Sequence, residues 1–374
     1  MIDPKILRQS AHDVAKNLAR RGYEFDANLY LQLETQRKSL QVENEELKNK
    51  RNINSKSIGV TKSKNEDISK LIQIGEEIND LLSGNERELN LLLSQIKNIE
   101  LDLPNLLSDK VPDGTSEKNN IVLKNWGKPR EFEFKPQDHV SLGDRLGLFD
   151  FESAGRISGS RFAIIKGPLA SLHRALIQFM LNLHTQEHDY EEIYAPYLVQ
   201  SQALIGTSQL PKFESDLFKI AGDKPLYLIP TAEVPLTNLV GSNVAKESEL
   251  PFKYVAHTPC FRSEAGSYGK DTKGLIRQHQ FEKVELVQIV KPKESEEALS
   301  SLTSHAENVL QELQLPYQLV SLCAGDIGFG VKRLATQRLS PHTPSPPPKR
   351  CRFRSAEVPR NNASTSKQQI YIYI

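Results

Sequence analysis

Leucine recurs every seven residues near the start of the chain, at Leu33, Leu40 and Leu47. A second apolar series has spacings of three and four, at Leu71, Ile74, Ile78 and Leu81, and returns in register at Leu92 and Ile99. These spacings put apolar side chains on one face of each of two long helices. Between the two series, the polar stretch SIGVTKSKNED contains Gly59 and predicts a turn. The pattern therefore predicts an antiparallel helical hairpin, or coiled coil, over residues 1–105.

The hydrophobic pattern changes after this hairpin. Residues 106–120 are rich in turn-forming residues and predict a linker. Beyond them, residues 169–187 predict an amphipathic helix, while IYAPYLV, YLIPTAEVPL and KVELVQIV have the β-branched and aromatic side chains of strands. Helical and strand segments alternate without a strict βαβ order. Residues 121–330 therefore predict an α+β domain with helices around antiparallel strands.

Two charged clusters lie between His257 and Leu286. Arg262 and Glu264 are two residues apart, so they share one face of a predicted strand. A polar, glycine-containing gap follows them. One face of a second strand would then carry Arg277, His279, Phe281, Lys283 and Glu285. The segment thus predicts two strands joined by a long loop.

This combination of side chains suits a nucleotide. Guanidinium groups bind phosphate oxygens, and an aromatic ring stacks on a purine. The carboxylates would then bind an amino group of adenine or of a substrate. A solvent-facing antiparallel pair with cross-strand salt bridges explains the same residues, and their spacing alone leaves both interpretations open.

Composition excludes several other classes of protein. The chain has 374 residues and 38% hydrophobic content, enough for about two or three domains. No apolar run resembles a signal peptide or a membrane span, so we expect a soluble, cytoplasmic protein without a membrane partner. The three cysteines are widely separated and predict neither a disulfide framework nor a zinc site. No GxGxxG or GxxxxGK[ST] motif indicates a dinucleotide fold or a P-loop.

Charge is distributed unevenly, although the formal net charge is only +1. Residues 48–64 contain no acid and six basic residues: Lys48, Lys50, Arg51, Lys56, Lys62 and Lys64. A solvated helix face is the simpler interpretation of such a run. Because acids are plentiful elsewhere in both predicted helices, a phosphate-binding hairpin tip is the alternative hypothesis.

Residues 331–374 differ from the rest of the chain. They contain nine Lys and Arg, a single acid, Glu357, clustered prolines and no glycine. Such a composition predicts a disordered, basic, Pro-rich tail. PPPKRCRFR is consistent with a nuclear address or a nucleic-acid-binding tail, and also with a randomly translated reading frame.

Several motifs now support a resemblance. TPCFRSEAGSYGKDTKGLIRQHQFEKVE is similar to the second signature motif of class II aminoacyl-tRNA synthetases. LIPTAEVPLTN, GTSQLPKF and LIRQHQFEKVE resemble the bacterial type of seryl-tRNA synthetase, and the predicted hairpin resembles the tRNA-binding arm of that family. The match extends from Met1 to about Gly330. It implies a class II antiparallel sheet domain after the arm, in a homodimer whose interface includes the region of Pro196, although an edge-strand proline predicts the same residue.

The resemblance also implies an activity. In the family, serine reacts with ATP, with Mg²⁺ as cofactor, to form seryl-adenylate and release pyrophosphate, and the seryl group then passes to tRNA(Ser); charging of tRNA(Sec) stays open. Arg262 and Arg277 would be catalytic, and ATP would contact Arg262, Ser263, Glu264 and Phe281. Serine would contact Thr231, Ala232, Glu233 and Glu285. The tRNA would contact Lys48, Lys50, Arg51, Lys56, Lys62 and Lys64.

The resemblance ends near Gly330. In the family, further strands then supply metal and ATP ligands and a glycine-rich third motif, none of which is recognisable in residues 331–374. No metal ligand is therefore identified, and the ATP site is expected to be incomplete and the ligase activity impaired. The alternative is a non-catalytic tRNA-binding remnant or paralogue of a synthetase.

Overall fold

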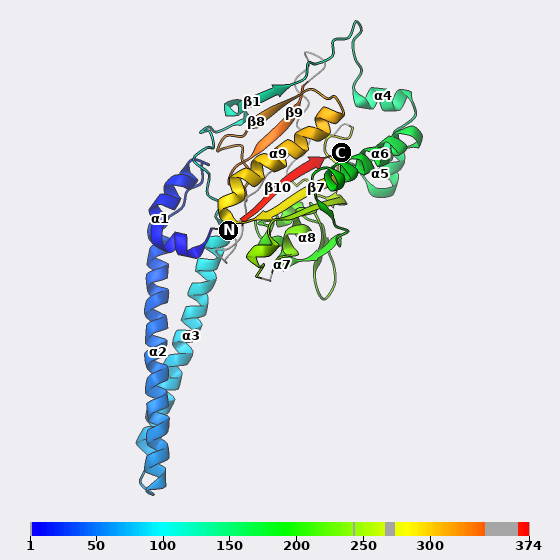
Figure 1. Cartoon of the computed structure of the whole chain (residues 1–374). Coiled ribbons are helices and arrows are strands. Elements are labelled where there is room, and N and C mark those ends of the chain that lie inside the picture. The colour runs from blue at the N-terminus through cyan, green and yellow to red at the C-terminus, as the bar shows by residue number, and fades with distance from the viewer. Residues whose placement is uncertain (1, 242–243, 266–273, 341–365, 374) are drawn as a thin grey trace. The chain divides into compact units, whose positions relative to one another are not determined.

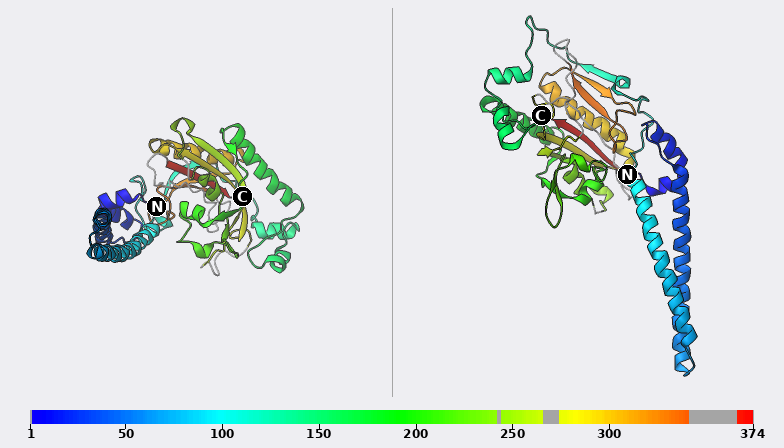
Figure 2. Two further views of the ribbon diagram at one scale, coloured as in Figure 1. Left: turned by 90° about the horizontal axis from the view of Figure 1, so that it is seen from below. Right: turned by 180° about the vertical axis from the view of Figure 1, so that it is seen from behind.

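The structure is a computed structural model that describes residues 2–241, 244–265, 274–340 and 366–373 (Figures 1 and 2). The chain forms two units. One comprises Ile2–Ala19 and Tyr23–Leu103, and the other comprises Arg20–Gly22 and the residues from Pro104 onward. In the described part of the chain, no helix is both long and apolar enough to cross a membrane.

The first unit consists of three helices: α1 (Pro4–Ala19), α2 (Ala27–Ser63) and α3 (Ser69–Asp102). The predicted hairpin is confirmed, since α2 and α3 lie side by side along their lengths (Figure 2). Leu47, Ile78 and Leu82 form a buried cluster between them. The periodicity was less accurate for Ile74 and Leu81, which are 44% and 55% exposed.

The turn lies within the predicted stretch SIGVTKSKNED, near its C-terminal end. Helix α2 continues through Gly59 to Ser63, and Asn65 adopts the left-handed conformation (φ 55°) that reverses the chain. A glycine inside a helix costs only about 1 kcal/mol, so the many hydrogen bonds of a long helix easily tolerate it. The basic window therefore lies on the last turns of α2 and at its end.

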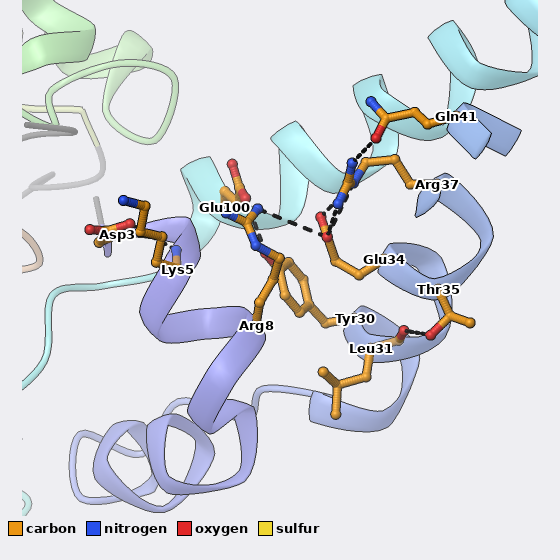
Figure 3. A network of polar contacts seen from close by, with 10 residues as sticks. All are labelled: Asp3, Lys5, Arg8, Tyr30, Leu31, Glu34, Thr35, Arg37, Gln41 and Glu100. Carbon is orange, nitrogen blue, oxygen red and sulfur yellow. Dashed lines mark hydrogen bonds and ion pairs between the residues drawn. The ribbon is translucent and has the colours of Figure 1, made fainter. Parts of the chain in front are cut away.

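A polar network joins the three helices at one end of this unit (Figure 3). The buried Glu34 carboxylate accepts hydrogen bonds from the Arg37 guanidinium, with a closest distance of 2.7 Å, and lies 3.9 Å from Arg8 on α1. The buried Tyr30 hydroxyl donates to Glu100 on α3 at 3.1 Å. Burial raises the pKa of Glu100, so hydrogen bonds and cations are needed to keep this carboxylate in the interior.

The second unit contains three sheets, confirming an α+β class. A four-stranded sheet has the order β10-β7-β6-β2, a second has the order β1-β8-β9 and a third the order β3-β5-β4. The strands are β1 (Ile121–Trp126), β2 (Glu191–Glu192), β3 (Leu198–Gln200), β4 (Lys219–Ile220), β5 (Leu226–Leu228), β6 (Phe252–Phe261), β7 (Gln280–Val290), β8 (Tyr317–Ser321), β9 (Ala335–Leu339) and β10 (Ser366–Tyr373). The helices are α4 (His139–Arg145), α5 (Phe151–Ser158), α6 (Gly167–Gln186), α7 (Ser201–Gly206), α8 (Glu233–Asn238) and α9 (Ser295–Glu312), with short 3-10 turns between several elements.

Strands β6 and β7 form the antiparallel pair that the sequence predicted. Phe252 pairs with Ile289 at one end and Phe261 with Gln280 at the other. On one face, Val255, Val284 and Leu286 pack against α6 and α9 in the largest core cluster. On the opposite face, cross-strand pairs align Cys260 with Phe281, Thr258 with Lys283 and Ala256 with Glu285. One face is therefore core, and the other carries the polar residues.

Three predicted elements need correction. The helix over residues 169–187 is confirmed as α6, but YLIPTAEVPL is not one strand: β5 ends at Leu228 and α8 begins at Glu233. Pro235 lies in the first turn of α8, where a backbone N–H has no helical partner, so proline is tolerated there. IYAPYLV forms only β3 at its end, because Pro196 has no donor for a ladder. The predicted linker, residues 106–120, packs into the unit through the buried Leu107 and Val111.

The prediction of a disordered tail after Gly330 was wrong for two segments. β9 pairs with β8, and Val331 and Leu334 are buried in a core cluster with Val320 and Leu322. The backbone of β10 pairs with β7 over residues 366–373. Composition missed these strands because short pairing segments need few apolar residues when a sheet edge already exists. The remaining tail residues, 341–365 and 374, including PPPKRCRFR, lie outside the described residues.

Candidate active site and nucleic-acid interface

Arg262 lies directly after β6 and faces the start of β7. Its backbone N–H donates to the His279 carbonyl at 2.9 Å, which continues the pairing beyond the strand ends. Its Nε donates to the Pro230 carbonyl at 3.3 Å, and its guanidinium carbon lies 5.2 Å from the centre of the Phe281 ring. The structure thus brings together an arginine and an aromatic ring, a pair suited to a phosphate and a base.

Ser263, Glu264 and Arg277 flank this pair, but not in strands. The Ser263 N–H donates to the Asp216 carbonyl at 3.0 Å, and its hydroxyl donates to the Ser215 carbonyl. Glu264 has a left-handed backbone (φ 51°), and its carboxylate forms an ion pair with Arg277 at 3.3 Å. The predicted strand positions of Arg262, Glu264, Arg277 and His279 were therefore wrong, because β6 ends at Phe261 and β7 begins at Gln280.

Glu285 is the centre of a second polar group, entirely buried on the same face of β7. Its Oε2 accepts from the Thr231 hydroxyl at 2.7 Å and from the Glu233 N–H at 3.0 Å, and lies 2.7 Å from the Lys283 ammonium. Lys283 also donates to the Thr231 hydroxyl. Thr231, Glu233 and Glu285 were predicted to act together, and the structure brings them into direct contact.

The two oxygens of Glu285 differ in their surroundings. Oε1 is buried and, among the described residues, has no hydrogen-bond donor. Burial raises the pKa of Glu285, while Lys283 and the hydrogen bonds from Thr231 and Glu233 act in the opposite direction. An ionised oxygen without a donor is costly in the interior. This oxygen is therefore suited to accept a hydrogen bond from a charged ligand.

Lys283 was absent from the predicted site residues. The period-two pattern had put it on the face of Phe281 and Glu285, and this was the available signal. Lysine is rarely buried completely without a partner, yet Lys283 has no exposed surface. The carboxylate two residues away on the same face could have indicated that partner.

Ala232 contributes differently from its neighbours. It is completely buried in a hydrophobic cluster with Leu236 and Ala256, and its side chain supplies no polar group. Cys260, also buried, lies beside Thr258 on the polar face of β6. Burial raises the pKa of this thiol, so the neutral thiol is favoured.

The predicted tRNA-binding residues all lie on or directly after α2. Lys48 is partly exposed and lies 3.6 Å from Glu45, whereas Lys50, Arg51, Lys56, Lys62 and Lys64 are exposed and form no ion pair with any described residue. The same part of α2 has a shallow groove of about 350 Å³, lined by Ile53, Lys56, Ser57, Val60 and Thr61. Free cations beside apolar side chains suit a nucleic-acid backbone and sugar.

The described ranges contain no cluster of protein ligands for a metal ion. Within them, no three His, Cys, Asp or Glu side chains are grouped so that they could hold a metal ion. The described residues therefore do not form a protein site for the Mg²⁺ that the family resemblance implies.

Comparisons with known proteins give two family matches. Residues 1–107 match the family "Seryl-tRNA synthetase N-terminal domain", and residues 216–359 match "tRNA synthetase class II core domain (G, H, P, S and T)". The second match continues past Gly330, where the resemblance read from the motifs had ended.

Individual relatives and solved structures match this chain over most of its length. The serine–tRNA ligase of Saccharophagus degradans is 52% identical over 333 residues, covering 89% of this chain and 78% of the relative. The crystal structure of seryl-tRNA synthetase from Pyrococcus horikoshii complexed with ATP has a TM-score of 0.86 at 30% identity and covers 100% of this chain and 92% of that one. A cytoplasmic serine–tRNA ligase of Naegleria fowleri in complex with AMP has a TM-score of 0.85 at 20% identity, covering 100% and 91%, which shows the fold alone.

Proposed function

The chain belongs to the seryl-tRNA synthetase family of class II aminoacyl-tRNA synthetases, and from this premise we propose that it activates serine with ATP and transfers it to tRNA(Ser). The observation that carries the proposal is the polar face of β6 and β7. There Arg262 and Phe281 lie together, and Thr231, Lys283 and Glu285 form a buried cluster. The cytoplasm, where bacterial translation occurs, is the proposed location.

The first reaction joins serine to AMP. A carboxylate oxygen of serine forms a bond to the α-phosphorus of ATP, and the bond from that phosphorus to the bridging oxygen of pyrophosphate breaks. Arg262 would bind the α-phosphate, Phe281 would stack on adenine, and Ser263 lies beside them. Preorganised cations of this kind stabilise the charge that develops on phosphorus, by several kcal/mol in general. Mg²⁺ would enter with ATP as part of the substrate.

Arg277 and Glu264 would change partners when ATP binds. Their 3.3 Å ion pair occupies the groups proposed to reach the reacting carboxylate and the adenine amino group. Because this pair is partly exposed, the free energy needed to separate it is small, on the order of 1 kcal/mol. Each group is then available to the substrates at little cost.

Serine selection would depend on the buried cluster. Glu285, together with Thr231 and Glu233, would bind the ammonium and hydroxyl groups of serine. Glycine and alanine are smaller than serine, so the site can reject them only by leaving its polar groups unpaired. Threonine would be rejected by steric crowding.

Serine-dependent exchange of pyrophosphate into ATP tests this proposal directly. We expect this exchange to be weak, because the ATP site is expected to be incomplete, and to require serine, with alanine supporting none. Background exchange together with retained tRNA binding would instead favour the non-catalytic alternative. Recovery of exchange after the tail from residue 331 is replaced by that of a relative would assign the defect to the ATP site.

The α2 cations are proposed to bind the backbone of tRNA(Ser). Replacing Lys56, Lys62 and Lys64 by glutamine should weaken tRNA binding and flatten its salt dependence. Each lost phosphate contact should reduce the slope of log affinity against log salt concentration by roughly one. Lys38→Gln, on the same helix outside the acid-free window, is the matched control. An unchanged salt titration would remove this surface from the proposal, and tRNA(Sec) can be tested in the same assay.

We also propose a homodimer. Leu172 on α6 is 54% exposed, Tyr194 is 88% exposed, and Pro196 is exposed nearby in sequence. Aromatic side chains such as that of Tyr194 are enriched at interfaces between subunits. Sedimentation velocity should show a dimer that Leu172→Glu converts to a monomer with an unchanged circular dichroism spectrum. A monomeric unmodified chain at micromolar concentration would contradict the proposal.

A further inference from the structure

Lys283 has no exposed surface and is bonded to two members of the proposed serine site. Its ammonium lies 2.7 Å from Glu285 Oε2 and also donates to the Thr231 hydroxyl. That hydroxyl in turn donates to Glu285 Oε2 at 2.7 Å. The three side chains form a closed triangle that begins on β7 and ends just before α8.

The triangle acts on one oxygen of Glu285 only. Oε2 accepts hydrogen bonds from the Thr231 hydroxyl and the Glu233 N–H, and it also contacts the Lys283 ammonium. These three donors use its capacity to accept hydrogen bonds. Oε1, on the same carboxylate, has no donor among the described residues. A carboxylate held by one oxygen is fixed in orientation and keeps its second oxygen for a ligand.

The positive charge of Lys283 also affects whether Glu285 is ionised. A fully buried carboxylate favours its protonated form, and a cation at hydrogen-bond distance favours the ionised form. Among the described residues, the other donors bonded to Glu285 are neutral, namely the Thr231 hydroxyl and the Glu233 N–H, and burial favours the neutral thiol of Cys260 on β6. Lys283 is therefore the cation that the described structure places in contact with this carboxylate.

We propose that Lys283 is a positioning residue of the serine site: it keeps Glu285 ionised and holds one carboxylate oxygen, so that the other oxygen accepts the substrate ammonium. This inference rests on the proposed function. Lys283 itself does not touch the substrate. It acts entirely through Glu285 and Thr231.

The test measures binding of serine, and of a non-hydrolysable seryl-adenylate analogue, to the full chain by calorimetry from about pH 6.5 to about pH 8.5. Lys283→Met has a similar length and no charge. At the lower pH it should bind serine on the order of tenfold to a hundredfold more weakly than the unmodified chain, and part of the loss should be recovered at the higher pH, where Glu285 ionises without help. The unmodified chain should bind almost equally across the range.

Glu282→Gln is the matched control, because it removes a carboxylate next to Lys283 that points to the opposite face and pairs with His257 at 2.8 Å. It should bind serine normally. Equal affinity of Lys283→Met and the unmodified chain would overturn the proposal, as would a loss that is the same at every pH. If the unmodified chain binds neither probe, the proposed function itself fails, which is a different result.

A measurement on the unmodified chain covers the case in which Lys283→Met does not fold. Infrared spectra at about pH 7 should contain no protonated-carboxyl band that Glu285→Gln removes, since Lys283 keeps Glu285 ionised. The presence of such a band would overturn the proposal without any substitution of Lys283.

Discussion

We expect replacement of Glu285 by alanine to abolish serine binding and serine-dependent pyrophosphate exchange. The substitution removes the acceptor of the substrate ammonium and leaves Lys283 as a buried cation without its carboxylate. Loss of one partner of a buried charged contact costs about 2 to 5 kcal/mol, a factor of roughly thirty to several thousand in affinity. Calorimetry with serine measures this loss directly.

Two further variants separate recognition from folding. Glu285→Gln keeps the volume and the hydrogen bond from Thr231, so it should fold more stably than Glu285→Ala and still fail to bind serine. Phe281→Ala removes the proposed adenine platform, so it should chiefly raise the ATP concentration needed for exchange and leave serine affinity nearly unchanged. If Phe281→Ala and Glu285→Ala gave the same kinetic phenotype, the separate roles assigned to them would be wrong.

The strands that carry the site were predictable because alternation with a period of two is the pattern of a β-strand. Period two identified one polar face running through Phe281, Lys283 and Glu285, and the structure has that face on β7. Sequence spacing could not fix where the strands end. Arg262 and Glu264 lie just beyond the end of β6, and a left-handed Glu264 has no sequence signal comparable to glycine.

Spacing and composition alone do not show which distant segments come into contact, and only the family resemblance grouped Thr231 with Glu285. Thr231 and Glu285 are far apart in the chain, and their hydrogen bond depends on the chain turning from β5 into α8 instead of continuing as a strand. Strands β9 and β10 were missed for a related reason. A short edge segment is stabilised by a partner strand that already exists, so its own composition is a weak guide.

A buried histidine cluster in the second unit should make its stability depend on pH. His184 on α6 is completely buried, with its Nδ1 3.0 Å from Nδ1 of His188, and His305 on α9 stacks on His188 with ring centres 4.1 Å apart. The Asn308 amide donates to His188 Nε2 at 3.1 Å, so His188 carries its proton on Nδ1 and donates it to His184. A second proton on His184, at Nδ1, would therefore point at the Nδ1–H group of His188 and repel it. The surrounding charged residues are Lys253, Glu187 and Asp189.

Burial and the neighbouring imidazoles lower the pKa of His184 to about 3 and that of His305 to about 4, from an ordinary value near 6.5. A lowered pKa means that the unfolded chain takes up the proton first. Stability is therefore fully present above about pH 6.5 and declines as the pH falls toward the folded-state values. Each such histidine contributes about 1.4 kcal/mol of lost stability per pH unit within that window.

The expected result is an acid-sensitive second unit whose sensitivity depends on His184. Between about pH 7 and pH 5, the contribution of His184 to the loss in free energy of unfolding should be about 2 kcal/mol, measured by urea titration at each pH. His184→Gln should remove that part of the pH dependence, since glutamine does not titrate. His173→Gln, on the same helix outside the cluster, should retain it. Equal pH dependence of the two variants would mean that the cluster is already protonated in the folded chain, which the short distance between His184 and His188 makes electrostatically unfavourable.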